Sequence, residues 1–73
     1  MENVKKSQCE MVYDYMKEYG SITALEAMVD IGCMRLAARI SDLRKSGIGI
    51  KSRTVRVPKR MGGFADIAEY SLV

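Results

Sequence analysis

The apolar positions of the chain first follow helical spacing, which predicts a helix between Ser7 and Gly20. Its buried stripe consists of Cys9, Val12, Tyr13 and Met16. Ser7 followed by Glu10 is the signature of a capping box, in which each side chain satisfies a backbone amide of the first turn. Gly20 suits the position just after a helix end, so both boundaries of this helix are readable.

A second apolar strip, formed by Met11, Tyr15 and Tyr19, lies beside the first stripe and widens the apolar arc to more than half the circumference. A helix that is covered on one side only needs a narrower arc. Two explanations stay open. Either the C-terminal strand covers the strip through Tyr70 or Leu72, or a homodimer forms through Met11, Tyr15 and Tyr19.

A shorter helix of two turns is expected next. Residues 21–22 form a very short extended piece, and Thr23 with Glu26 makes a second capping box. The helix should end near Asp30, because Gly32 permits the sharp turn that other residues resist. Its apolar side consists of Leu25, Met28 and Val29.

A third helix is predicted from Met34 to Ser46, with Gly47 just past its end. Its buried stripe is Leu36, Ile40 and Leu43, flanked by Ala37. At 100° per residue, five residues project away from that stripe: Arg35, Ala38, Arg39, Asp42 and Lys45. Arg44 lies near the buried side, where we expect its side chain to run along the core or to pair with an acid.

After Gly47 the apolar period becomes that of a β-strand, over residues 48–57. Ile48 and Ile50 should point inward, and Lys51 and Arg53 outward. Val55 and Val57 share the parity of that basic pair, which predicts a bulge or a strand switch. Pro58 ends the strand. Residues 59–63 have turn composition, and residues 65–73 form a second strand with Ala68, Tyr70 and Leu72 on one face.

Positive charge is concentrated in one segment of the chain. The net charge is +3, yet residues 34–60 hold nine Lys or Arg against Asp42 alone. Residues 1–33 hold three lysines against six acids. Such clustering is expected of a protein that meets a polyanion, whereas charges that only confer solubility would be interspersed.

Several classes of site are not expected. The chain has no histidine, and two cysteines, Cys9 and Cys33, do not make a zinc site. We expect both to be buried apolar groups without a disulfide. The sequence shows no phosphate loop and no nucleophile beside a base, so we expect no catalysis, cofactor, metal or small-molecule substrate. It shows no membrane span or secretory signal either. We expect a flexible tail over 1–6, one domain over 7–73, and a cytoplasmic location.

Helix, short helix, glycine turn, basic helix and hairpin together resemble a winged helix-turn-helix domain. The stretch "GSITALEAMVDIGCMRLAARISDLRKSGIGI" is similar to the core of small helix-turn-helix proteins of phages and prophages, and "RLAARISDLRKSG" is its most specific part. The resemblance covers about residues 7–73. It implies an α+β fold of three helices with a C-terminal two-stranded β-hairpin as the wing.

The resemblance also implies a DNA-binding surface on the third helix and the wing. On the helix it places Arg35, Ala38, Arg39 and Asp42 at the groove, and Lys45 projects from the same face. On the wing it places Lys51, Arg53, Arg56, Lys59 and Arg60. Arginine can contact guanine O6 and N7 together, whereas wing cations would bind phosphates.

The sequence therefore predicts a double-stranded DNA-binding protein. The resemblance implies that it is a phage or prophage transcription regulator in a bacterial host. Two alternatives stay open. One is a protein-interaction module of the same fold, which would use the Met11, Tyr15 and Tyr19 strip. The other is an excisionase-like architectural factor that bends DNA. The target sequence, the sign of regulation, the oligomeric state and the choice between Arg35 and Arg39 as base reader are left open.

Overall fold

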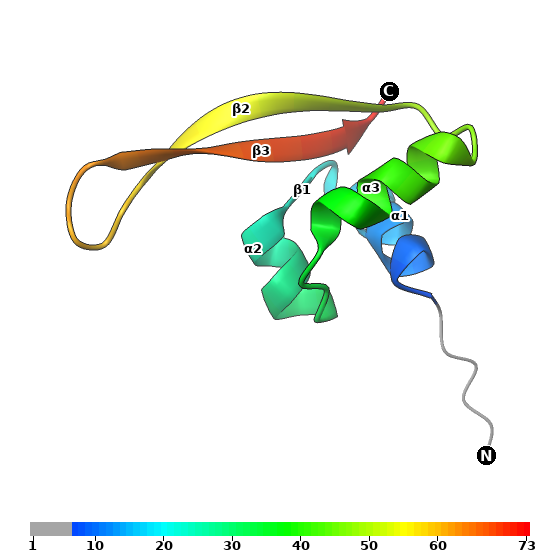
Figure 1. Cartoon of the computed structure of the whole chain (residues 1–73), viewed down its shortest axis with the longest axis horizontal. Helices are drawn as coiled ribbons and strands as arrows, with labels where there is room; N and C mark the ends of the chain where they lie inside the picture. The colour runs from blue at the N-terminus through cyan, green and yellow to red at the C-terminus, as the bar shows by residue number, and fades with distance from the viewer. Residues whose placement is uncertain (1–6) are drawn as a thin grey trace, which may run out of the picture.

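The computed structural model describes residues 7–73, so the tail expected over 1–6 lies outside the described residues. Three helical segments gather beneath one end of a long β-hairpin, which projects well beyond them (Figure 1). The elements are α1 (Gln8–Tyr19), β1 (Ile22–Thr23), α2 (Ala24–Glu26) with its π-helical continuation η1 (Ala27–Ile31), α3 (Leu36–Lys45), β2 (Ile50–Pro58) and β3 (Phe64–Leu72). The expected α+β arrangement of three helices and a hairpin wing is confirmed.

Both predicted capping boxes are present and start the helices where the sequence indicates. The Ser7 hydroxyl accepts a hydrogen bond from the Glu10 amide at 3.1 Å, and the Glu10 carboxylate accepts one from the Ser7 amide at 2.9 Å. Thr23 and Glu26 repeat the exchange at 3.3 and 2.9 Å. Gly20 follows α1 with φ +91°, the left-handed conformation that favours glycine.

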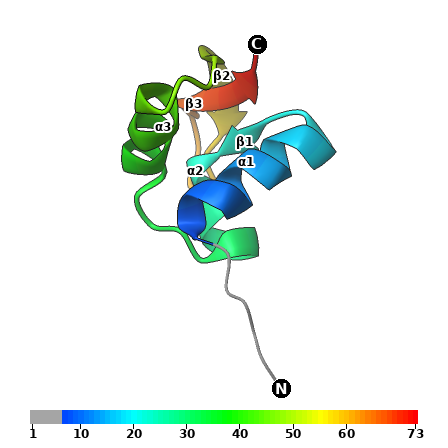
Figure 2. The ribbon, with the colours of Figure 1, turned by 90° about the vertical axis from the view of Figure 1, so that its right-hand side faces the viewer.

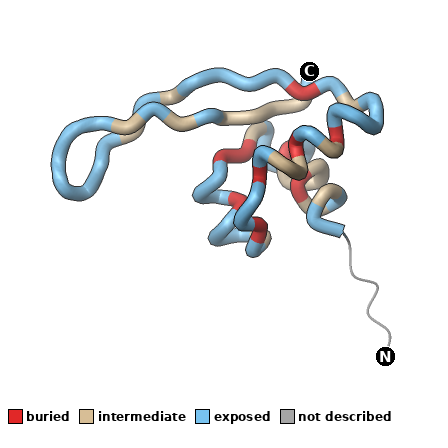
Figure 3. Tube along the Cα trace, viewed as in Figure 1, coloured by how far each residue is buried: buried red, intermediate tan, exposed pale blue. Residues whose placement is uncertain are grey.

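The core is small and lies under one end of the sheet. Its buried apolar residues come from α1, η1 and α3, from the loop before α3 and from the near ends of two strands: Val12, Met16, Ile22, Ala27, Cys33, Leu36, Ile40, Leu43 and Ile50. Buried positions therefore cluster in the helical body, and the far part of the hairpin is exposed or half-buried (Figure 3). Cys33 is buried as expected, and Cys9 is half-buried.

The α2–η1 segment turns a different side to the core from the one its sequence suggests. Leu25 and Val29 are 63% and 69% exposed, and Met28 is exposed as well, whereas Ala27 is fully buried. The chain makes only three α-helical residues before the wider π-turn, so the spacing of a regular α-helix does not apply. The small side chain of Ala27 lets this segment approach the core closely.

Helix α3 is shorter than predicted. Leu36, Ile40 and Leu43 are buried as expected, but the helix begins at Leu36, and Arg35 has non-helical backbone angles of φ −126° and ψ 63°. The helix ends at Lys45 rather than Ser46. Ala37, expected beside the buried stripe, is exposed.

The sheet has three strands, one more than the predicted hairpin. All pairs are antiparallel in the order β1-β3-β2, with Ile22 opposite Tyr70 and Thr23 opposite Glu69. The extended piece expected before α2 thus pairs with the C-terminal strand. It joins the helical part of the chain to the base of the hairpin.

The bulge expected in the first hairpin strand is wrong, because β3 pairs every residue of β2 from Ile50 to Pro58 in one unbroken register. Only at the base of the hairpin does one face of the ribbon pack against the core. Beyond the Thr23–Glu69 pair no third strand lies alongside, so the apolar side chains can change faces without breaking the ladder. Four half-buried residues share the face opposite Ile50: Val55, Val57, Ala65 and Ile67.

The orientation of α2 and η1 can be tested with two substitutions. Ala27→Leu should destabilise the domain by about 1–3 kcal/mol, because extra methylene groups do not fit a fully buried site. Leu25→Ala should change the free energy of unfolding by no more than about 0.5 kcal/mol, because Leu25 is exposed. Urea unfolding followed by circular dichroism measures both. The reverse order of the two effects would contradict the orientation described above.

Candidate nucleic-acid interface

The buried stripe of α3 determines which of its residues face solvent. Helices α3 and α1 lie on opposite sides of the helical body, as two views at right angles show (Figures 1 and 2). The outward surface of α3 consists of Arg35 at its start, the exposed residues Ala37, Ser41 and Lys45, and the half-buried Ala38. Small side chains therefore occupy the middle of this surface and cations its two ends, which lets another molecule approach the helix backbone closely.

Arg35 and Lys45 carry the unneutralised charge of this surface. No acid among residues 7–73 lies within 4.0 Å of either side chain's nitrogens. Ala37 and Ser41 were missed by sequence reasoning. Their small, uncharged side chains gave no signal, although a helical wheel places Ser41 well away from the buried stripe.

Arg39 and Asp42 form an ion pair at the edge of α3. Arg39 Nη2 lies 3.2 Å from Asp42 Oδ2, and the two side chains are 33% and 48% exposed. Cys9 Sγ in α1 approaches the same carboxylate oxygen at 4.0 Å, so this edge of α3 faces α1. The Nε of Arg39 is buried and has no hydrogen-bond partner among the described residues. The ion pair thus holds the Arg39 side chain at the edge of α3 that faces α1, whereas Arg35 is exposed.

Arg44 has a structural contact. Its Nε and Nη2 donate hydrogen bonds to the Ile50 carbonyl oxygen at 3.3 and 2.9 Å. Of the two alternatives expected for Arg44, the pairing with an acid is not seen among residues 7–73. The guanidinium instead links the end of α3 to the start of β2, which fixes the helix relative to the base of the wing.

Two of the predicted wing cations are paired with acids directly across the ladder. Arg53 Nε lies 2.7 Å from Glu69 Oε1, and Arg56 Nε lies 3.1 Å from Asp66 Oδ1. These pairs neutralise the middle of the ribbon. Lys59 and Arg60, at the hairpin tip, have no acid of residues 7–73 within 4.0 Å.

The predicted site residues do not all lie on one surface. At the base of the hairpin Ile50 points into the core, so Lys51 and Arg53 project from the other face of the sheet. There they line a shallow hollow together with Tyr19, Gly20, Ser21, Glu69 and Ser71. The structure thus separates these two cations from the outward face of α3.

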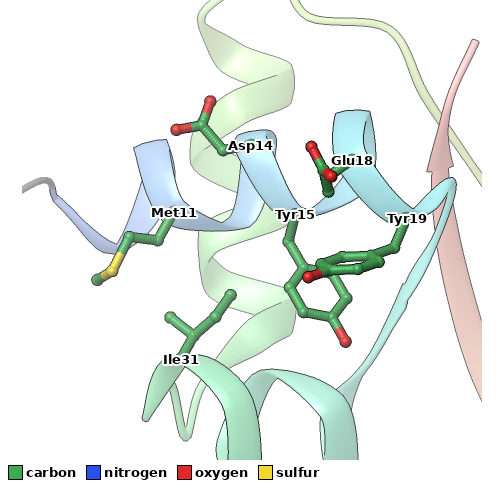
Figure 4. A pocket seen from close by; sticks show the side chains of 6 residues that line it. All are labelled: Met11, Asp14, Tyr15, Glu18, Tyr19 and Ile31. Carbon is green, nitrogen blue, oxygen red and sulfur yellow. The ribbon is translucent and has the colours of Figure 1, made fainter.

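The strip formed by Met11, Tyr15 and Tyr19 is partly covered by η1, a partner that neither sequence-based explanation named. The Tyr15 hydroxyl donates a hydrogen bond of 2.6 Å to Asp30 Oδ2. The rings of Tyr15 and Tyr19 lie 4.6 Å apart at 50°. Ile31 closes the lower side of the resulting pocket, and two carboxylates of α1 lie along its upper side: Asp14 and Glu18 (Figure 4).

Residues 7–73 contain neither a metal-binding cluster nor a membrane-spanning helix. No group of three or more His, Cys, Asp or Glu side chains in this range is placed to hold a metal ion. No helix in the same range is long and apolar enough to cross a membrane.

The hydrogen bond to Asp30 raises the pKa of Tyr15 from 10.0 to about 12, with smaller contributions from desolvation and from nearby negative charge. The unfolded chain therefore loses this proton first. The stability that the bond contributes is complete below pH 10 and is lost as the pH rises to about 12. Asp30→Asn should return the pKa of Tyr15 towards 10, as followed by tyrosine ring NMR shifts. Asp66→Asn, which removes a wing carboxylate, is the control and should leave it unchanged.

Comparison with known proteins agrees with this geometry. The family described as the winged helix-turn-helix domain matches residues 7–73, which is the whole described part of the chain. Searches of curated proteins and of solved structures found no match. The family match, the basic outward helix and the projecting hairpin lead to one conclusion: the chain belongs to the winged helix-turn-helix family, whose fold is that of DNA-binding domains.

Proposed function

We propose that the protein binds double-stranded DNA with α3 in the major groove. The observation that carries this proposal is the outward surface of α3, where Arg35 and Lys45 flank the small residues Ala37 and Ser41. An α-helix fits the major groove of B-DNA, and small side chains allow it to enter deeply. Helix α1, which carries Glu10, Asp14 and Glu18, lies on the opposite side of the helical body from α3 (Figure 2), so electrostatic attraction favours approach from the α3 side.

Arg35 is the strongest candidate for reading a base. It stands at the N-terminal end of α3, the part of a recognition helix that contacts base edges in helix-turn-helix complexes. Arg39 reaches a base only if it shares or leaves Asp42. Asp42 can itself accept a hydrogen bond from cytosine N4, so the pair remains a candidate reading unit together with Ala38.

The proposed phosphate contacts are made by cations at the wing tip and at the C-terminal end of α3. Lys59 and Arg60 at the wing tip and Lys45 on α3 are exposed cations with no acid of residues 7–73 within 4.0 Å. Their attraction is independent of sequence and holds the protein in register on the duplex. Lys51 remains a proposed contributor by long-range attraction. Arg53 and Arg56 contribute only where they exchange Glu69 and Asp66 for phosphates.

The biological role proposed here is transcription regulation in a phage or prophage setting, in the cytoplasm of a bacterial host and without catalysis. The regulatory role rests on the proposed groove-reading helix. The phage setting rests on the resemblance of residues 20–50 to small helix-turn-helix proteins of phages. An architectural role in recombination is the main alternative.

Duplex binding should depend steeply on salt. On α3 and the hairpin, Arg44 is held by the Ile50 carbonyl, and five other cations have no acid of residues 7–73 within 4.0 Å: Arg35, Lys45, Lys51, Lys59 and Arg60. If four or five of them neutralise phosphates, log K should fall with log[salt] at a slope of about −3.6 to −4.5. Fluorescence anisotropy with a labelled duplex at several salt concentrations measures this slope. A slope near zero, or no binding at low salt, would contradict the proposal.

Two variants should distinguish base recognition by α3 from phosphate binding by the wing. Arg35→Ala should cost about 1–3 kcal/mol on the preferred site and relax the base preference at one position. The double substitution of Lys59 and Arg60 by Ala should weaken binding to all sequences about equally, because these contacts go to phosphates. Selection from random duplexes followed by sequencing gives both preferences. A change of preference in the wing variant alone would mean that the reading element is misassigned.

Interaction with a second protein or a second copy of the chain is the alternative that the α1 strip supports. The exposed part of this strip is Tyr19, 69% exposed, beside Glu18 and Asp14. A two-fold interface brings each patch against itself, so carboxylates would face carboxylates. We therefore propose that any homodimer through Met11, Tyr15 and Tyr19 is weak without DNA.

Sedimentation velocity tests this assembly. The wild type should sediment as a monomer without DNA, and Glu18→Gln should strengthen association by removing a like charge from the interface. Tyr15→Glu should abolish it. If wild type and Glu18→Gln both stay monomeric, with and without a duplex site, the homodimer is wrong.

A further inference from the structure

The tip of the wing combines an exposed apolar residue with two adjacent cations. Met61 is 94% exposed, the most exposed of the large hydrophobic residues, and it directly follows the exposed Lys59 and Arg60. Residues 59–63 connect β2 to β3, and this end of the hairpin lies far from the buried segments of the helical body (Figure 3). The Met61 side chain therefore contributes nothing to the core. The tip combines cations, which suit a negatively charged surface, with an apolar side chain, which suits the apolar groups that lie beneath such a surface.

The backbone of the tip is closed by its own hydrogen bonds. The Lys59 amide donates to the Gly63 carbonyl at 2.9 Å, and the Gly62 amide donates to the Lys59 carbonyl at 3.1 Å. Gly62 and Gly63 have φ of +109° and +78°, which glycine adopts without steric cost. Met61 is thus presented from a tight, defined turn.

The ribbon that carries this turn is held together along its length. Its ladder is unbroken to Pro58, and the cross-strand pairs Arg53–Glu69 and Arg56–Asp66 join its two strands. On one face, Val55 lies opposite Ile67 and both are half-buried. These contacts favour a stiff ribbon, which holds the tip at a fixed place relative to the core.

The free length of the ribbon matches the spacing of the grooves of DNA. Beyond the Thr23–Glu69 pair that ends β1, β2 continues for five residues, from Thr54 to Pro58. At about 3.4 Å per residue these residues extend about 17 Å. Half of a DNA turn of about 34 Å is the same distance. With α3 in the major groove, the tip can therefore reach the adjacent minor groove.

We propose that Met61 inserts between two base pairs in the minor groove next to the major groove that α3 occupies, and that this insertion bends the duplex. Lys59 and Arg60 bind the phosphates on either side and hold the tip in the groove. Apolar wedges of this kind unstack one base step and bend DNA by about 20–90° towards the major groove. The inference rests on the proposed DNA binding, and it assigns to the hairpin tip the bending of the same duplex.

The test measures DNA bending by energy transfer between dyes at the two ends of a short duplex containing the selected site. The full chain should bend this duplex by about 20–90°. Met61→Ala should lose most of the bend while its affinity stays within about tenfold, because the cationic contacts remain. Met61→Lys should lose the bend and bind at least as tightly at low salt, because it adds a cation. Val73→Ala removes another exposed apolar side chain, far from the tip, and should bend DNA as the wild type does.

A 2-aminopurine substituted at successive minor-groove steps locates the insertion, and its fluorescence should rise at one step with the wild type and not with Met61→Ala. Binding without bending, or bending that survives both Met61 substitutions, would overturn the inference and leave the proposed DNA binding intact. Failure of every variant and of the wild type to bind duplex DNA at low salt would overturn both.

Discussion

The packing of the apolar stripe of α3 onto the body of the domain is the constraint on which the rest of the structure depends. Leu36, Ile40 and Leu43 bury their side chains in a core that also contains Val12 and Met16 of α1. Each buried side chain of this size contributes about 1.5–3 kcal/mol, a large share of what a small domain gains. With so few core residues, α3 has one favourable rotation about its axis. That rotation decides which side chains face outward.

The same packing separates the charges of the molecule. Helix α1, which carries three carboxylates, and helix α3 lie on opposite sides of the helical body (Figure 2). Along the wing, the pairs Arg53–Glu69 and Arg56–Asp66 are exposed, so each stabilises the fold by no more than about 1 kcal/mol. Their main effect is to neutralise the middle of the ribbon. Unpaired positive charge is left on α3, on the outer face of the sheet base and at the tip.

Local features of the fold were predictable because they depend on neighbouring residues. The capping boxes at Ser7 and Thr23 need only a partner three residues away, and both formed as expected. Gly20 and Gly32 end their helices with positive φ, which no other residue adopts as easily. The buried stripe of α3 also follows from spacing alone. These short-range patterns were sufficient to indicate the order of elements and the wing.

Contacts between distant segments decided the rest. A helical wheel gives angles about one axis and does not say which neighbour lies at each angle, so it could not show that α1 lies beside Asp42 or that Arg39 is drawn into an ion pair. Nor could spacing show that η1 would hold Tyr15. The sequence by itself determined which segments are helical, where the two capped helices start and where positive charge is concentrated, because propensity, capping and charge are local properties. The tertiary structure decided which of those charges are neutralised and which stay exposed, because ion pairs, the third strand and the buried face of α2 depend on residues far apart in the chain.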